Sequence, residues 1–183
     1  DSARKCEVNR VVHIGTDEVY GSVEVGSSLE TDAVDPRSPY SASKAGSDLI
    51  ASAYFHTYGL PVMITRCTNN FGAFQYPEKA IPLFTTNLLR GGKVPLYGDG
   101  LHQRDWLYVD DHCSGITAVL EYGSIGEIYN IGSGRELTNI SLAMLILSAV
   151  GKESSQIQYV EDRKGHDFRY AVNFEKIENI GFK

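Results

Sequence analysis

Residues 10–15 read RVVHIG, and the polar residues TDE follow at 16–18. A short run rich in β-branched residues is typical of a buried parallel strand, and the abrupt change to polar residues marks its carboxyl end. Residues 38–59 begin with Ser-Pro, which suits the N-cap and first turn of a helix, and they end on glycine. Residues 61–66 (PVMITR) read as a second strand. The order strand, helix, strand predicts a right-handed parallel crossover and therefore an α/β fold.

The remainder of the chain continues this alternation of short apolar runs and helical patterns, without repeats or low-complexity segments. Asp110 is the expected N-cap of a helix within this part. We expect strands at residues 94–97, 106–109, 128–131 and 157–160, and helices at 79–90, 110–121, 138–151 and 174–179.

The composition is that of a globular protein with a moderate negative charge. Hydrophobic residues make up 42% of the 183 positions, and 17 Lys and Arg against 23 Asp and Glu give a net charge of −6. Because no basic run is present, this balance argues against a nucleic-acid partner. The longest apolar stretch, residues 142–147, is far below the roughly 20 residues that cross a bilayer, so we expect no membrane partner.

Cysteine and histidine are sparse and widely spaced. The three cysteines, at positions 6, 67 and 113, form no CxxC pair, which favours a reduced, cytoplasmic location over a disulfide scaffold. The five histidines have no metal-ligand spacing, so the sequence predicts no metal site.

Tyr40 and Lys44 are four residues apart in the helix predicted at 38–59, which places both side chains on one face. A neighbouring ammonium favours the ionised form of a phenol, and a phenol tuned in this way can take a proton from an alcohol at neutral pH. The alternative is a surface tyrosine beside a solvated lysine.

Thr16, Asp17 and Glu18 follow the first predicted strand, at the edge where open parallel sheets bind ligands. Two adjacent carboxyl groups can act as acid and base when their surroundings separate their pKa values. Such a pair suits the elimination of water next to a carbonyl. The alternative is a helix N-cap with loop acids that have no chemical role.

Eight sequence motifs, two of which contain the Tyr40–Lys44 pair and the Thr16–Asp17–Glu18 triplet, are spread along nearly the whole chain. They are TDEVYG (16–21), SPYSASK (38–44), TRCTNNFG (65–72), PEKAIPL (77–83), PLYGDG (95–100), RDWLYVDDH (104–112), YNIG (129–132) and DRKGHD (162–167). In this order and spacing, the chain resembles the dTDP-glucose 4,6-dehydratases, NAD-dependent members of the extended short-chain dehydrogenase/reductase family. The resemblance implies the carboxyl-terminal part of a Rossmann-like parallel sheet plus a smaller α/β substrate-binding lobe.

The resemblance also implies catalytic roles. Tyr40 would remove the proton of the sugar 4-hydroxyl, Lys44 would lower the pKa of Tyr40 and hold the nicotinamide ribose of NAD, and Thr16 would hydrogen-bond the 4-oxygen. Glu18 would then abstract the C5 hydrogen while Asp17 protonates the departing 6-hydroxyl. A carboxylate is adequate for this step only because the hydrogen lies beside a ketone, and hydroxide leaves only when it is protonated.

Binding residues are assigned by the same resemblance. Asn70 joins Tyr40 and Lys44 on the cofactor side, and the expected substrate is dTDP-glucose. The residues expected to bind it are Thr16, Asn69, Lys79, Ala80, Pro95, Leu96, Tyr97, Arg104, Asn130, Asp162, Arg163, Lys164, Gly165 and His166. The resemblance further implies a homodimer that pairs through a four-helix bundle.

Cations are needed to hold a diphosphate on a net acidic protein. Lys79, Arg104 and His166 are the expected ones, with Arg104 binding bidentately. Their alternative interpretation is ordinary surface charge.

Within the resembling family, the residue at position 17 distinguishes dTDP-glucose 4,6-dehydratases from epimerases, decarboxylases and GDP-mannose dehydratases. Sugar-nucleotide epimerases share the Tyr-x3-Lys pattern but lack the acid–base pair, and decarboxylase or GDP-mannose dehydratase relatives typically read Thr-Ser-Glu at 16–18. Two alternatives remain open: another sugar-nucleotide epimerase or decarboxylase, and a noncatalytic module that binds sugar nucleotides.

Three features depart from the family pattern. Gly15 stands where Ser is usual, and Lys164 stands where Pro is usual. No glycine-rich dinucleotide fingerprint follows a first strand, and we interpret the glycines at 132–134 as a turn. We therefore expect a partial sequence that alone neither binds NAD measurably nor turns over. Residues 1–70 would be the remainder of the NAD-binding domain and 71–183 mainly the substrate lobe, with 105–132 returning to the sheet.

Overall fold

A computed structural model describes residues 1–182. The first sheet of the fold has three parallel strands. Their order is β1 (Val11–Thr16), β2 (Val62–Cys67) and β6 (Ile128–Ile131). All six residues of β2 are buried, as expected for a central strand covered on both faces. The register pairs Thr16 with Cys67, so the carboxyl ends of β1 and β2 lie side by side.

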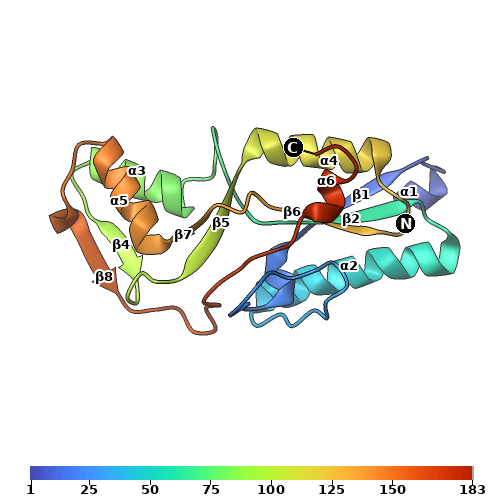
Figure 1. The fold of residues 1–183 in the computed structure, drawn as a ribbon, viewed down its shortest axis with the longest axis horizontal. Helices are drawn as coiled ribbons and strands as arrows, with labels where there is room; N and C mark the ends of the chain where they lie inside the picture. The colour runs from blue at the N-terminus through green and yellow to red at the C-terminus, as the bar shows by residue number, and fades with distance from the viewer. Residues whose placement is uncertain (183) are drawn as a thin grey trace.

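Two long helices cover this sheet on opposite faces, α2 (Pro39–Tyr58) and α4 (Val109–Tyr122) (Figure 1). A capping box starts α2, because Ser38 and Ser41 each accept a hydrogen bond from the other residue's backbone N–H. Gly59 ends it in the left-handed region, with φ of 66°. The short helix α6 (Glu175–Glu178) packs beside β6.

A second group of elements forms the other end of the molecule (Figure 1). The strands β4 (Val94–Tyr97) and β8 (Ile157–Val160) pair in parallel, and α3 (Ala80–Leu89) and α5 (Asn139–Ala149) pack against each other and on β4. Leu88, Leu96 and Leu147 are almost completely buried in the core between them.

A third small sheet connects the two ends of the molecule. It contains β3 (Asn69–Phe71), β5 (Gln103–Tyr108) and β7 (Glu136–Thr138), with β5 parallel to β3 and antiparallel to β7. The remaining elements are the helix α1 (Ser2–Lys5) and the 3-10 helices η1 (Asp17–Tyr20) and η2 (Ser154–Gln156).

Several boundaries differ from the sequence prediction by one to three residues, and two of these differences have a clear structural cause. The strand expected at 106–109 is β5, which begins three residues earlier because it pairs with both β3 and β7. The expected N-cap Asp110 is wrong: Tyr108, in extended conformation, occupies that position, and Asp110 lies in the first turn of α4, where a negative charge favours the helix dipole. In the described part of the chain, no helix combines the length and apolar character needed to cross a bilayer.

Candidate active site

The carboxyl end of β1 carries the first group of site residues. Thr16 is the last residue of the strand and the N-cap of η1, and its hydroxyl accepts a hydrogen bond of 3.4 Å from the Glu18 backbone N–H. The same hydroxyl donates to Asp17 Oδ1 at 3.3 Å. Because η1 starts directly after the strand, the two carboxyl groups leave the chain at the edge of the sheet.

Asp17 is 3% exposed, and this burial is the largest cause of its raised pKa. Burial and the neighbouring Glu18 charge raise the pKa of Asp17 from 3.8 to about 8, although Arg104 opposes the shift. Its Oδ2 atom is buried and has no hydrogen-bond partner among residues 1–182. At neutral pH, Asp17 is therefore mainly a protonated acid with one oxygen available to another group.

Glu18 has a different electrostatic environment. Burial raises its pKa, but the positive charges of Arg104, Lys79 and Arg163 act in the opposite direction. The cations favour the ionised form of Glu18, whereas the desolvated Asp17 retains its proton. The two carboxyl groups can thus divide the roles of base and acid.

Tyr40 lies in the first turn of α2 and is 55% exposed. Its pKa is raised, by burial first and then by the charges of Glu18, Cys67 and Asp17, which places the phenol in the same electrostatic environment as both acids. Lys44 is not among the groups that act on the pKa of Tyr40 in this structure, so its expected effect on Tyr40 stays a prediction. The Lys44 ammonium instead donates to the Ile14 backbone oxygen at 2.8 Å.

Cys67, at the end of β2, was missed by the sequence analysis. Burial and the Asp17 charge raise the pKa of its thiol to about 11. Asn70 Nδ2 donates to Cys67 Sγ at 3.4 Å, and Asn70 Oδ1 is buried without a partner among the described residues. The register that pairs Thr16 with Cys67 would have identified this thiol as a neighbour of the acids.

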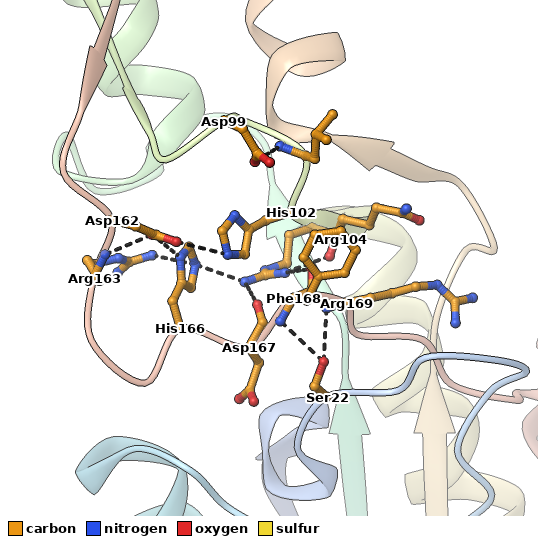
Figure 2. Close-up of polar contacts among 12 residues, drawn as sticks. Ser22, Asp99, His102, Arg104, Asp162, Arg163, His166, Asp167, Phe168 and Arg169 are labelled. Carbon is orange, nitrogen blue, oxygen red and sulfur yellow. Dashed lines mark hydrogen bonds and ion pairs between the residues drawn. The ribbon is translucent and has the colours of Figure 1, made fainter.

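The cations that act on Glu18 come from three separate parts of the chain. Lys79 precedes α3, Arg104 lies in β5, and Arg163 lies in the segment after β8. Figure 2 shows Arg104 among the residues of 162–169. The fold thus places three positively charged side chains near Asp17 and Glu18.

Arg104 is buried and its terminal nitrogens already have protein partners. Nη1 donates to the backbone oxygens of Gln103 and Phe168, at 2.6 and 3.1 Å, and Nη2 donates to the Asp167 oxygen at 2.8 Å and to His166 Nε2 at 3.0 Å. These four contacts occupy all four terminal N–H groups. In this arrangement Arg104 holds the backbone oxygens of Asp167 and Phe168 and the side chain of His166, and its expected bidentate contact with a diphosphate stays a prediction.

His166 is the centre of a polar cluster that Figure 2 shows. Its Nδ1 lies 2.9 Å from Asp162 Oδ1, and Arg163 Nη2 lies 3.1 Å from Nε2. The Arg163 guanidinium also lies 5.0 Å above the ring of Tyr97, which comes from the end of β4. Three of the expected binding residues of 162–166 and Tyr97 are therefore in one place.

Other expected binding residues lie elsewhere. Asn130 is completely buried: its Oδ1 accepts from the Tyr20 hydroxyl at 2.8 Å, and its Nδ2 donates to two backbone oxygens. Leu96 has its side chain in the core, so only its backbone can face a ligand. Lys164 is exposed, and Gly165 takes a φ of 68° that disfavours a side chain. The remaining three are Asn69 in β3, Ala80 at the start of α3 and Pro95 in β4.

The geometry supports a particular type of chemistry. A phenol, a protonated carboxylic acid and an ionisable carboxylate share one site at the edge of a parallel sheet, beside a group of cations. This set can move protons to and from neighbouring atoms of one bound molecule, while the cations attract an anionic part of it.

Comparison with known proteins identifies relatives that are dehydratases of nucleotide sugars. A family model described as GDP-mannose 4,6 dehydratase matches residues 1–183. A dTDP-glucose 4,6-dehydratase from Actinoplanes sp. is 52% identical over the whole chain, which covers 58% of that relative. Another, from Streptomyces antibioticus, is 53% identical and is covered to 55%.

Solved structures agree with this match. The crystal structure of DesIV, a dTDP-glucose 4,6-dehydratase from Streptomyces venezuelae with NAD and TYD bound, superposes with a TM-score of 0.97 at 56% identity, over 99% of this chain and 56% of that chain. A UDP-glucose 4-epimerase from Thermus thermophilus with NAD gives 0.91 at 31% identity, over 100% and 61%. The predicted α/β Rossmann-like class is thus confirmed, and the chain spans little more than half the length of these relatives.

Proposed function

Because this chain belongs to the family described as GDP-mannose 4,6 dehydratase, we propose that it carries the catalytic residues of an NAD-dependent dTDP-glucose 4,6-dehydratase. The enzyme converts dTDP-glucose to dTDP-4-keto-6-deoxyglucose and water. The supporting observation is the pair of carboxyl groups beside Tyr40, in which Asp17 has a pKa of about 8 and three cations favour ionised Glu18. An epimerase needs no such acid, because no hydroxide leaves.

The first step is oxidation at C4 of the sugar. Tyr40 takes the proton of the 4-hydroxyl, and the Thr16 hydroxyl hydrogen-bonds the same oxygen. NAD, when bound, supplies reversible hydride transfer. Tyr40, Lys44 and Asn70 are proposed to hold its nicotinamide end. Asn70 Oδ1, which has no partner among residues 1–182, suits a ligand N–H such as that of a carboxamide.

The second step is elimination of water. The new C4 carbonyl acidifies the hydrogen on C5, and Glu18 removes it as a proton. The C6–O bond breaks as Asp17 gives its proton to the departing oxygen, so a C5–C6 double bond and one water form. The hydride taken from C4 would then be returned to C6 from the cofactor, and Glu18 would give its proton back to C5, which completes the 4-keto-6-deoxy sugar.

The nucleotide lies on the cationic side of the site in this proposal. Lys79 and Arg163 face the diphosphate, and Tyr97 offers a partly exposed ring for the base or ribose. Arg104 contributes its buried charge and holds the backbone of Asp167 and Phe168. We extend the proposal to a cytoplasmic homodimer, with residues 1–70 in the cofactor-binding domain and 71–183 mainly in the substrate lobe.

The test is incubation of the full-length protein with dTDP-glucose and NAD. The expected product shows the alkali-induced absorbance of a 4-keto-6-deoxy sugar, and Asp17→Asn is expected to reduce its formation strongly. A protein that converts dTDP-glucose without this absorbance is an epimerase or decarboxylase. A protein that binds dTDP-glucose but leaves it unchanged is a noncatalytic module, and either result contradicts the proposal.

A further inference from the structure

His102 lies in the connection between β4 and β5 and is not among the residues assigned above. It is 6% exposed, and its ring stacks on that of His166 with 4.1 Å between centroids and 19° between planes. His102 Nε2 lies 3.2 Å from Asp162 Oδ2, while Asp162 Oδ1 faces His166. One carboxylate thus joins two stacked imidazoles (Figure 2).

The partners determine which nitrogens of the two rings carry protons. Arg104 and Arg163 can only donate, so His166 Nε2 must be the unprotonated acceptor of both. His166 therefore carries its proton on Nδ1 and donates it to Asp162. Since Asp162 accepts, His102 donates from Nε2, and a proton on its buried Nδ1 would have no acceptor among residues 1–182.

This proton arrangement argues against a metal ion in the cluster. One ligand atom each from His102, Asp162 and His166 lie within 4.8 Å of one another, which is close enough for a metal. A metal on His166 Nδ1 would move the ring proton to Nε2, where it would face two guanidinium groups that cannot accept it. The cluster is therefore better described as a hydrogen-bonded chain from His102 to the arginines.

We propose that His102 is a positioning residue of the nucleotide site, which holds Asp162 so that His166 keeps the tautomer that accepts from Arg104 and Arg163. The inference rests on the proposed function, because it treats residues 162–166 as part of that site. Arg163 stacks on Tyr97, and Arg104 anchors the backbone of Asp167 and Phe168. Loss of the His102 contact loosens this whole arrangement without removing any group that touches the reacting atoms.

Several neighbouring groups shift the pKa of His166. Burial lowers its pKa most, Asp162 raises it through a hydrogen bond, and the positive charges of Arg163, Arg104 and His102 lower it. The ring of Tyr97 stands edge-on at 6.5 Å. His166 is thus a neutral acceptor at neutral pH, which agrees with the tautomer assigned from the contacts.

The test compares two substitutions of similar size. His102→Gln keeps an N–H near the position of Nε2, whereas His102→Leu removes the donor. By calorimetry with dTDP, we expect His102→Leu to weaken binding about tenfold and His102→Gln to remain within about twofold of the unmodified protein. His56→Leu, on the exposed side of α2, is the control and should leave binding unchanged.

Nitrogen-15 NMR of the histidine rings, recorded without nucleotide, gives an independent measurement. We expect His166 in the unmodified protein and in His102→Gln to be the Nδ1–H tautomer, and a mixture of tautomers in His102→Leu. An Nε2–H tautomer in the unmodified protein, equal loss of dTDP binding in both variants, or stoichiometric Zn²⁺ binding that His102→Leu abolishes would each overturn the inference. If the unmodified protein fails to bind dTDP, the proposed function fails, and the NMR result alone still decides the role of His102.

Discussion

The Asp48 carboxylate lies directly against Gly15, so that a Cβ at Gly15 would stand 2.9 Å from Asp48 Oδ1 and 2.7 Å from the Thr65 backbone oxygen. Asp48 in turn bonds Arg66 at 2.9 Å. Because Gly15 has no side chain, the buried Asp48–Arg66 ion pair fits against the strand that leads to Asp17 and Glu18. This contact gives a physical reason for the glycine where the resembling family has Ser.

The close approach predicts that Gly15→Ala destabilises the protein. A Cβ at these distances forces the Thr65 backbone or the ion pair to move, at a cost of about 1–3 kcal/mol. The matched control is Gly46→Ala in the interior of α2, where a Cβ meets nothing within 4 Å and should stabilise the helix by about 0.5–1 kcal/mol. Denaturant unfolding measures both changes, and equal effects of the two substitutions would refute the argument.

The raised pKa of Asp17 predicts the alkaline side of the pH–rate profile. The proton on Asp17 is needed for loss of the 6-hydroxyl, and the group loses it as the pH rises through about 8. The rate of elimination should therefore fall above that pH. Asp17→Asn should slow elimination about 10²–10⁴-fold while C4 oxidation changes less. Single-turnover measurement of NADH formation and water loss separates the steps, and equal loss of both would count against the acid role.

The same pKa shift predicts a change in stability with pH. Folded Asp17 binds its proton more tightly than the unfolded chain does, so its contribution to the free energy of unfolding decreases as the pH rises from about 4 to about 8. Asp17→Asn should remove this slope and make the protein more stable than the unmodified one at pH 8. Exposed Glu121→Gln is the control, and its unfolding midpoint should follow that of the unmodified protein across the range.

Tyr40→Phe tests the proposed base with little effect on folding. The ring is 55% exposed, so removal of the hydroxyl should leave the unfolding midpoint nearly unchanged. The rate of C4 oxidation should fall about 10²–10⁴-fold. A Tyr40→Phe protein that oxidises dTDP-glucose at the normal rate would assign the base role to another group.

The elements that pack against a continuous core were readable from the sequence, whereas the short ones were not. The Ser-Pro start and Gly59 end predicted α2 almost to the residue, since capping depends on local sequence. The three-residue strands β3 and β7 exist because they pair with β5, at positions more than thirty residues away along the chain in each case. Such pairing leaves little local pattern.

The site residues divide in a similar way. The acids and Tyr40 could be placed together because parallel strand ends and helix starts meet at one sheet edge. The contacts of Arg104 with backbone oxygens at 167 and 168 depend on a segment over 60 residues away, so the sequence suggested a free cation instead. His102 was missed for the same reason, because its role depends on Asp162.

The Arg66–Asp48 ion pair predicts a strong asymmetry between single and double substitutions. Both side chains are nearly completely buried, and Arg66 also lies 4.7 Å above the Tyr20 ring. Asp48→Ala leaves the guanidinium without its carboxylate and should cost about 3–5 kcal/mol, because an uncompensated buried charge is more costly than a missing pair. Arg66→Met in the Asp48→Ala background removes that charge and should restore part of the stability. Urea unfolding of both single variants and the double variant gives the coupling energy, and strictly additive losses would show that the two residues act independently.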